Sequence, residues 1–359
     1  MLSDNCKTAI SGYLILHMQM RRKFLFILIF TLTPIACSNQ QNPNAYQLSG
    51  STMGTTYNIT IVGENLVNHE LINSALEDIE SAMSTYRLES ELMQLNEAPI
   101  NTWINVSPAL YEVLLISEEI SVLSNGAFDI TVSPLVNLWG FGPEKHKNDT
   151  LPNTEAIEEL LRNIGFEYLI IAEDREAVLK REMIRLDLSA VAKGYAVDVL
   201  AELLEENNIS NYLVEIGGEI SGRGRNAEGD LWQIAIEAPL RSAQNREPFQ
   251  IIGISGLSLA SSGDYRNFFE VDDIHYSHTI DPSSGSPINH NLASVTVIAE
   301  TTAIADALAT AFNVMGIEQA MALANNNNIA VYFIIKTADG FLESYSMAFA
   351  QYINENYND

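Results

Sequence analysis

Cysteine is almost absent from this sequence. Only Cys6 and Cys37 occur in 359 residues, and both precede the first regular strand pattern, which begins near Tyr46. A disulfide framework therefore cannot stabilise the body of the protein. Its stability must come from a hydrophobic core, and a chain of this length is able to bury one.

Basic residues are also scarce. The sequence has 19 lysines and arginines against 46 aspartates and glutamates, which gives a formal net charge of -27. This balance excludes non-specific nucleic-acid binding and a basic membrane-binding surface, because both need clustered positive charge. An anionic substrate would need a local cation, and Lys193, Arg225, Arg266 or a bound divalent metal could supply it.

The apolar run at residues 24–32 is too short to span a membrane as a helix. It follows Met20 and the three basic residues 21–23, and it leads to Ile35-Ala36-Cys37, where a small residue directly precedes the cysteine. This arrangement is typical of a bacterial lipoprotein signal. Pro34 departs from the pattern, because such signals usually have leucine three residues before the cysteine.

We therefore expect three regions. Residues 1–36 would hold an upstream extension and the signal peptide, with Met20 as the start, and residues 37–45 would hold a lipidated Cys37 and a tether. Residues 46–359 would form the folded body. A lipid on Cys37 would anchor this body on the periplasmic side of a bacterial membrane, which could be either the outer or the inner membrane.

The body shows both strand and helix periodicity. Tyr57, Ile59 and Ile61 alternate as in a strand, and apolar residues four apart over 67–83 predict an amphipathic helix. A second helix is predicted over 107–123, capped by Ser107 and ended by Asn125-Gly126. Further strands are predicted at 166–171, 177–179, 184–186, 212–216, 232–236 and 292–299. This order favours an α+β fold with mixed or antiparallel sheets and packed helices over alternating βαβ units.

Residues 276–287 concentrate groups that can do chemistry. The stretch holds His278, Asp281 and several hydroxyls, and it contains Asp-Pro and Gly-x-Pro sequences that force turns. Taken alone, a surface turn with one histidine is the commoner interpretation. As a functional loop, it would offer His278 or Asp281 as a general base, and His278 is the better candidate because its ordinary pKa lies near neutral pH.

Two further segments suit phosphate and metal chemistry. Lys193 follows a strand and enters a helix, where unpaired amides attract phosphate; an ordinary capped helix is the alternative. Asp306 and Thr310 are four residues apart, so they share one face of an alanine-rich helix. A carboxylate on such a packed face needs a partner, and hard oxygen ligands of this kind suit Mg²⁺.

Together, these segments resemble the ApbE family of FAD:protein FMN transferases over nearly all of residues 46–352. The resemblance rests on Ser51-Thr52-Met53-Gly54-Thr55, Ser84-Thr85-Tyr86-Arg87, Gly126-Ala127-Phe128-Asp129, Asp187-Leu188-Ser189-Ala190-Val191-Ala192-Lys193-Gly194-Tyr195, Ile216-Gly217-Gly218-Glu219, Ser262-Gly263-Asp264-Tyr265, His278-Thr279-Ile280-Asp281-Pro282 with Gly285, and Ala305-Asp306-Ala307-Leu308-Ala309-Thr310. Glu219 and Ser262 depart from the family, which usually has Asp and Thr there.

The resemblance implies a two-lobed, T-fold-related catalytic domain. It implies an enzyme that cleaves the FAD pyrophosphate with Mg²⁺, attaches FMN to a threonine or serine of a target flavoprotein and releases AMP. The implied targets are Nqr- or Rnf-type subunits of respiratory complexes. The implied flavin-binding residues are Met53, Tyr86, Ala127, Phe128, Asp129, Asp187, Lys193 and Ile280. The implied metal ligands are Asp306, Thr310 and backbone oxygens at Ala190 and Ala309.

Two other functions remain open from the sequence. The same site would serve an FAD pyrophosphatase that gives FMN and AMP, with water replacing the acceptor hydroxyl. A non-catalytic, lipid-anchored flavin-binding protein is the other alternative. Holding a flavin requires neither a metal nor a base, so the presence of Asp306, Thr310 and His278 argues against it.

Overall fold

The computed structural model describes residues 44–142, 151–239, 248–263, 268–271 and 274–354. The predicted signal peptide (1–36), the predicted lipidation site Cys37 and most of the predicted tether lie outside the described residues.

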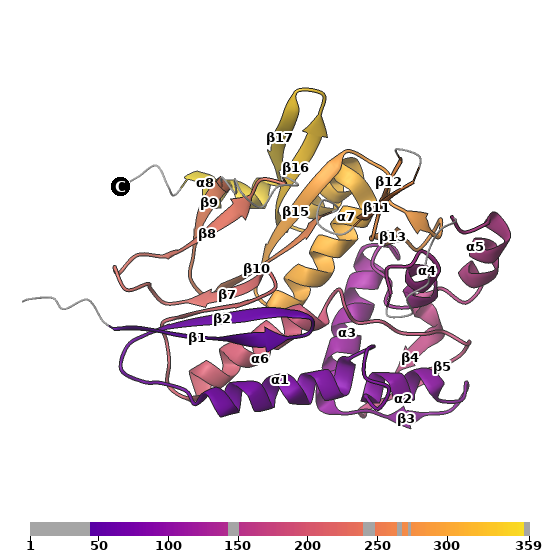
Figure 1. Cartoon of the computed structure of the whole chain (residues 1–359), viewed down its shortest axis with the longest axis horizontal. Coiled ribbons are helices and arrows are strands. Elements are labelled where there is room, and N and C mark those ends of the chain that lie inside the picture. The colour runs from indigo at the N-terminus through magenta and orange to yellow at the C-terminus, as the bar shows by residue number, and fades with distance from the viewer. Residues whose placement is uncertain (1–43, 143–150, 240–247, 264–267, 272–273, 355–359) are drawn as a thin grey trace, which may run out of the picture. The chain divides into compact units, whose positions relative to one another are not determined.

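An eight-stranded sheet forms the centre of the described body (Figure 1). Every neighbouring pair in it is antiparallel, as expected. In spatial order its strands are β1 (Ala45–Thr52), β2 (Thr55–Val62), β6 (Tyr212–Ile216), β7 (Glu219–Arg223), β10 (Leu257–Gly263), β15 (Leu292–Ala299), β16 (Ala330–Thr337) and β17 (Gly340–Tyr345). The inner strand β15 is buried along almost its whole length, which shows that both faces of the sheet are covered there.

Four helices contribute to the main hydrophobic cluster on one side of this sheet. They are α1 (His69–Met83), α3 (Pro108–Leu123), α6 (Ala192–Glu206) and α7 (Thr302–Asn326). Two of them, α6 and α7, pack against the strands of the sheet, and α1 and α3 pack against those two helices. The predicted cap of α3 is present, because Ser107 Oγ accepts a hydrogen bond from Leu110 N at 3.3 Å. α7 carries Asp306 and Thr310 as predicted, and it contains a non-helical residue at Gly316. Its length and composition would allow a membrane span, but it packs against β10 and β15 as a core helix.

The opposite face of the sheet is covered by a hairpin and by the C-terminal helices. β8 (Trp232–Glu237) pairs with β9 (Pro248–Ile254), and η2 (Met347–Phe349) leads into α8 (Ala350–Asn354). These elements share a second hydrophobic cluster with the sheet. Neighbouring sheet residues alternate between the two clusters; Ala260 and Val297 belong to the first, and Leu259 and Ile298 belong to the second.

Shorter elements complete the fold. They are α2 (Glu91–Glu97), β3 (Ile104–Asn105), α4 (Ser133–Leu138), α5 (Thr154–Leu161), η1 (Phe166–Tyr168), β4 (Leu169–Ile171), β5 (Ala177–Lys180), β11 (Phe268–Val271), β12 (Ile274–Ser277), β13 (Ile280–Asp281) and β14 (Ser286–Pro287). The predicted α+β class is confirmed. The described body forms a single compact unit.

The strand predicted at 184–186 is wrong. Residues 184–186 have no strand partner, and the side chain of Asn96 takes its place. Asn96 Oδ1 accepts from Leu186 N at 2.7 Å, and Asn96 Nδ2 donates to Leu186 O at 3.0 Å. The apolar pattern of this segment therefore reflects burial against the core rather than a sheet ladder.

Candidate active site

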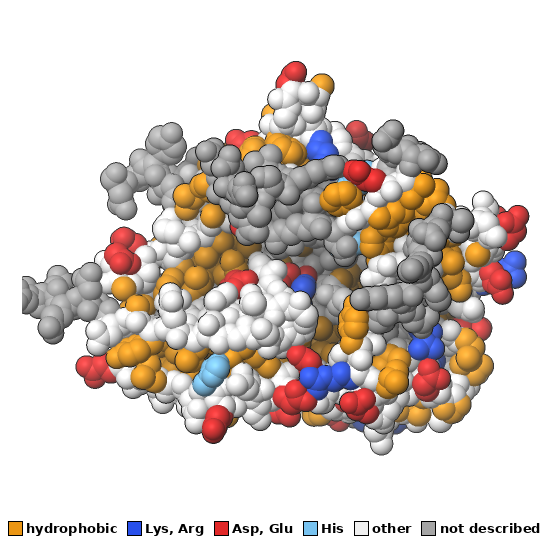
Figure 2. Space-filling view, in the orientation of Figure 1, with side chains coloured by type: hydrophobic (Ala, Val, Ile, Leu, Met, Phe, Trp, Pro, Cys, Tyr) orange, Lys and Arg blue, Asp and Glu red, His pale blue; other side chains and the backbone are white. Residues whose placement is uncertain are grey.

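A pocket of about 710 Å³ lies among the main sheet, β8, the first turns of α6 and α7, the segment 127–142 that includes α4, and the segment 278–282. Acidic and basic side chains gather at the hollow near the middle of this face (Figure 2). The pocket brings together most of the residues expected from the resemblance. Those that line it are Tyr86, Ala127, Phe128, Asp129, Asp187, Ala190, Lys193, His278, Ile280, Asp306 and Thr310. Met53, Asp281 and Ala309 are not among the lining residues.

A lysine and two carboxylates form the polar centre of the pocket. Lys193 Nζ lies 3.0 Å from Glu219 Oε1 and 3.5 Å from Asp306 Oδ2. Gly194 N also donates to Asp306 Oδ2, at 3.2 Å. Asp306 and Glu219 are almost fully buried, and Glu219 Oε2 has no hydrogen-bond partner among the described residues. With one positive and two negative groups, this cluster attracts a further cation.

Close packing of α6 against α7 positions this cluster. A Cβ added at Gly194 would lie 2.4 Å from Thr302 O, so only glycine allows the two helices to approach this closely. Asp198 of α6 caps the start of α7, because its carboxylate accepts from Thr302 N at 2.7 Å and from Ala303 N at 2.8 Å. These contacts fix the register of α7, and therefore the position of Asp306 beside Lys193.

The pKa values of Lys193 and Glu219 are both raised, but for different reasons. Burial alone would lower the pKa of Lys193, but Asp306 and Glu219 outweigh it and the pKa is raised, so the ammonium stays charged. Burial raises the pKa of Glu219 to about 7, despite the opposing charge of Lys193. Glu219 is therefore able to exchange a proton near neutral pH.

The donor set fits a magnesium ion. Asp306 and Thr310 both line the pocket from one face of α7. Ala190, which lies just before α6 in the sequence, lines it too. Within the described residues there is no group of three or more His, Cys, Asp or Glu side chains that could hold a metal. A single carboxylate with a hydroxyl and backbone oxygens is a poor zinc site, but it suits Mg²⁺, which is commonly bound by one or two carboxylates together with substrate phosphates.

Two aspartates expected to bind flavin are engaged within the protein. Asp129 is buried; its Oδ1 accepts from Thr131 N at 2.8 Å, and its Oδ2 accepts from Phe166 N at 3.0 Å. Burial raises the pKa of Asp129, and the Thr131 hydrogen bonds oppose that change. Asp187 Oδ1 accepts from Ser189 N at 2.8 Å. Both carboxylates line the pocket while stabilising the loops that form its wall.

The loop expected to carry the base separates its two candidates. His278 lines the pocket, and its ring meets the ring of Phe141 edge-on with 6.3 Å between centroids. Asp281 instead stabilises its own turn, accepting from Ser283 N at 2.9 Å and from Ser283 Oγ at 2.7 Å. Trp139 Nε1 donates to Gly285 O at 2.8 Å and secures the far end of this turn. The geometry favours His278 over Asp281.

Met53 and Tyr86 occupy different environments near the pocket edge. Met53 is at the tip of the β1–β2 hairpin, and its side chain packs against the main hydrophobic cluster. Tyr86 lines the pocket with 73% of its surface exposed. The ring of Tyr86 is therefore available to a ligand.

Sequence reasoning overlooked several pocket residues. Glu219 was noted only as a departure from the family, and Thr296 and Ser261 were not singled out. Ser261 Oγ and Thr296 Oγ1 lie 2.8 Å apart on neighbouring strands at the pocket. Small polar residues on the otherwise apolar, fully buried strand β15 were the available signal, because buried polar groups on a core strand need a reason to be there.

The α+β body thus has a pocket that combines the Lys193, Glu219 and Asp306 cluster with aromatic side chains, which is the kind of concave site that binds small molecules and cofactors. The ApbE family model matches residues 53–333. The FAD:protein FMN transferase of Haemophilus influenzae is 42% identical over 328 residues, covering 89% of this chain and 94% of the relative. The FAD:protein FMN transferase of Escherichia coli K12 is 38% identical over 314 residues, covering 85% and 88%.

Solved structures give the same result. Flavin transferase ApbE from Vibrio cholerae superposes with a TM-score of 0.79 at 40% identity, covering 86% of this chain and 99% of that one. The apo flavinyl transferase ApbE of Pseudomonas stutzeri gives a TM-score of 0.79 at 37% identity, covering 87% and 97%. This chain belongs to the ApbE family.

Proposed function

We propose that this protein is an FAD:protein FMN transferase. It would cleave the pyrophosphate of FAD, join the FMN phosphorus to the hydroxyl oxygen of a threonine or serine in a target flavoprotein, and release AMP. The observation that carries this proposal is the pocket, which places the Lys193–Asp306 cluster and Thr310 within one cavity that also has aromatic walls at Tyr86 and Phe128. Its volume is in the range of small-molecule and cofactor sites, about 300–1,000 Å³.

Asp306, Thr310 and the backbone oxygens of Ala190 and Ala309 would hold Mg²⁺. When bound, this ion would offset the negative charge of the FAD pyrophosphate. The net negative charge of the lysine–carboxylate cluster favours a divalent cation there, and the raised pKa of Lys193 keeps its ammonium available to a phosphate oxygen. Met53, Tyr86, Ala127, Phe128, Asp129, Asp187 and Ile280 remain the predicted flavin-binding residues.

His278 would accept the proton of the acceptor hydroxyl as its oxygen attacks phosphorus. Its position on the pocket wall allows this, and histidine titrates near neutral pH. We expect His278→Ala to slow transfer by about 100-fold while FAD binding is retained. Asp281→Asn changes a residue that does not itself line the pocket and should have a much smaller effect. Undiminished transfer by His278→Ala would rule out this role.

The targets and the location are part of the same proposal. We infer that the acceptors are flavoprotein subunits of Nqr- or Rnf-type respiratory complexes. A lipid on Cys37 would hold the enzyme at the periplasmic side of a bacterial membrane, where such subunits are within reach. If so, Cys37→Ala should move the protein from the membrane fraction to the soluble fraction; recovery of the variant in membranes would contradict the anchor.

The decisive experiment combines the purified protein with FAD, Mg²⁺ and a flavoprotein fragment that bears an acceptor threonine. The intact mass of the fragment should rise by one FMN phosphodiester, and Asp306→Ala should abolish the increase. Glu318→Gln is the matched control, because Glu318 lies on the same helix and is exposed. Free FMN and AMP with an unmodified fragment would identify a pyrophosphatase, and intact FAD would leave a binding protein.

A further inference from the structure

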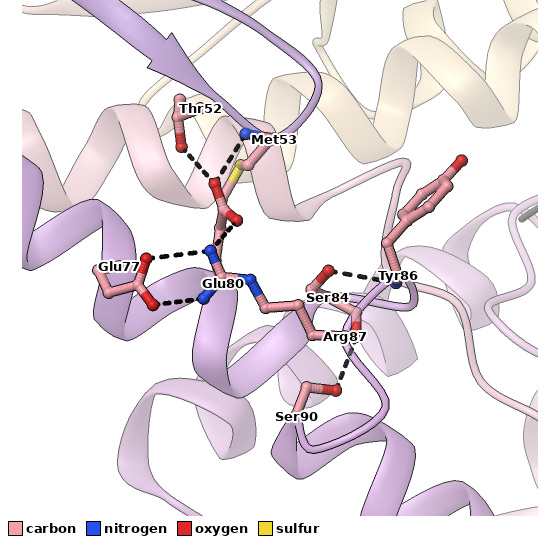
Figure 3. A network of polar contacts seen from close by, with 8 residues as sticks. All are labelled: Thr52, Met53, Glu77, Glu80, Ser84, Tyr86, Arg87 and Ser90. Carbon is pink, nitrogen blue, oxygen red and sulfur yellow. Dashed lines mark hydrogen bonds and ion pairs between the residues drawn. The ribbon is translucent and has the colours of Figure 1, made fainter.

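One carboxylate connects two chain segments that lie far apart in sequence at the pocket edge. Glu80 is near the end of α1, and its Oε1 accepts from Thr52 Oγ1 and from Met53 N, each at 2.9 Å. Its Oε2 pairs with Arg87 Nη2 (Figure 3). Glu80 therefore holds the tip of the β1–β2 hairpin and the loop after α1 through a single side chain.

The hairpin tip needs such support. Thr52 pairs with Thr55, so Met53 and Gly54 form a two-residue turn, and both have positive φ values of 47° and 72°. Such a turn normally has Asn, Asp or Gly at its first position, because a bulky side chain is strained there. Met53 adopts this conformation while its amide donates to Glu80, which stabilises the turn from outside the hairpin.

The loop that carries Tyr86 is fixed at both ends. Ser84 Oγ accepts from Tyr86 N at 3.2 Å, and Ser84 O accepts from the buried Ser90 Oγ at 2.6 Å. Ser90 N in turn donates to Arg87 O at 3.0 Å. The Tyr86 ring points away from this network (Figure 3) and is mostly exposed, so packing alone does not orient it. Its position depends on the backbone that the network holds.

We propose that Glu80 is a positioning residue, which fixes the Met53 turn and the Tyr86 loop relative to each other and thereby sets the affinity of the pocket for the flavin nucleotide. This rests on the proposed function, since Tyr86 acts on a flavin only if FAD is the substrate. Glu80 is not among the residues that line the pocket. Its effect is transmitted through the backbone of the residues that it holds.

The neighbouring Glu77 provides a matched control. It lies one turn earlier on α1 and also pairs with Arg87, with Glu77 Oε2 accepting from Arg87 Nη2 at 3.0 Å. Among the described residues, Glu77 makes no hydrogen bond or ion pair with the hairpin. Its side chain is 61% exposed, whereas that of Glu80 is 21% exposed. Removing either acid takes one partner from Arg87, but only the loss of Glu80 releases the hairpin.

The test measures KM for FAD, kcat and FAD affinity by flavin fluorescence in the full chain. Glu80→Ala should raise KM about 10-fold with kcat nearly unchanged, because the residue affects binding rather than a contact formed only in the transition state. Glu80→Gln keeps an acceptor for Met53 N and should recover part of the affinity. Glu77→Ala should stay close to wild type. A Glu80→Ala enzyme with unchanged KM would overturn the proposal, and Glu80→Gln provides the same measurement if the alanine variant does not fold.

A double-variant experiment separates positioning from general destabilisation. If Glu80 acts through Tyr86, Tyr86→Ala should weaken FAD binding much less in the Glu80→Ala background than in wild type. Independent effects that multiply would contradict the proposal. Failure of the wild-type protein to bind FAD would instead reject the proposed function, so the two failures are distinguishable.

Discussion

Two carboxylate–cation pairs in this protein differ in how fully their oxygens are hydrogen-bonded. Glu80 pairs with Arg87 at the pocket edge, and both of its oxygens have partners. Glu219 pairs with Lys193 inside the pocket and is only 4% exposed, yet its Oε2 has no partner among the described residues. The more deeply buried acid is therefore the less completely satisfied one.

This difference separates a structural anchor from a group that can meet a ligand. Burial opposes ionisation of both acids. At Glu80 the hydrogen bonds from Met53 and Thr52 and the Arg87 charge outweigh burial, and the pKa is lowered. At Glu219 burial dominates and raises the pKa to about 7. Glu80 thus stays ionised as part of the framework, while Glu219 keeps a free oxygen and an exchangeable proton beside the proposed metal ligand Asp306.

Removing the two cations should give the largest contrast. Lys193→Met leaves Glu219 and Asp306 buried without their shared partner, and we expect a loss of about 3–5 kcal/mol in unfolding free energy. Arg87→Met removes a partly exposed pair and should cost no more than about 1 kcal/mol. Urea denaturation of both variants measures the difference. Equal losses would show that the two pairs do not differ in the way described.

The second contrast concerns the helix contact behind the inner pair. Gly194→Ala would place a Cβ 2.4 Å from the backbone oxygen of Thr302, which has no room to move because it begins α7. We expect a destabilisation of about 2–3 kcal/mol, together with weaker activity because Asp306 moves away from Lys193. Gly253→Ala is the control, since its nearest neighbours are side-chain atoms of Leu231 at 3.0 and 3.1 Å, with no backbone atom among them. If both variants lose the same stability, close helix packing does not position the cluster.

The inner half of the site was largely predictable from local sequence. A lysine at the start of a predicted helix and an Asp306–Thr310 pair on one helical face were recognisable, because cap signals and helix periodicity fix where a helix starts and which residues share a face. What the sequence could not give was the meeting of α6 with α7, which depends on Gly194 and on Asp198 capping a helix more than a hundred residues later. Nothing in a local pattern encodes such a pairing.

The edge of the site was less predictable. The turn at Met53 and the loop at Tyr86 are recognisable as motifs in the sequence. Their connection through Glu80 is not, because the sequence pattern does not distinguish Glu80 from the other acidic residues of α1. The strand predicted at 184–186 was wrong for a similar reason: an asparagine side chain from α2 replaced the backbone partner. In both cases a side chain took a role that sequence patterns assign to backbone.

The smallest effect, and the sharpest comparison, is the dependence of stability on pH. Because folding raises the pKa of Glu219 from its ordinary value of 4.5 to about 7, the folded state binds more protons than the unfolded state between these values. Its contribution to stability is therefore greatest at low pH and falls as pH rises to 7. Glu219→Gln should remove this fall. The unfolding free energy of the variant relative to wild type should therefore rise by on the order of 1–3 kcal/mol between pH 5 and pH 8.

The pKa of Glu80 is lowered, so its sign is opposite: its contribution is present above the ordinary glutamate value and is lost as pH falls below it. Glu80→Gln should be destabilised at neutral pH by up to about 1 kcal/mol, a figure reduced by solvent screening of a partly exposed pair, and this deficit should shrink in acid. Chemical denaturation across pH measures both variants against wild type. Slopes of the same sign would mean that hydrogen-bond completeness does not distinguish these two acids, and the assignment of one as anchor and the other as ligand-ready would fail with it.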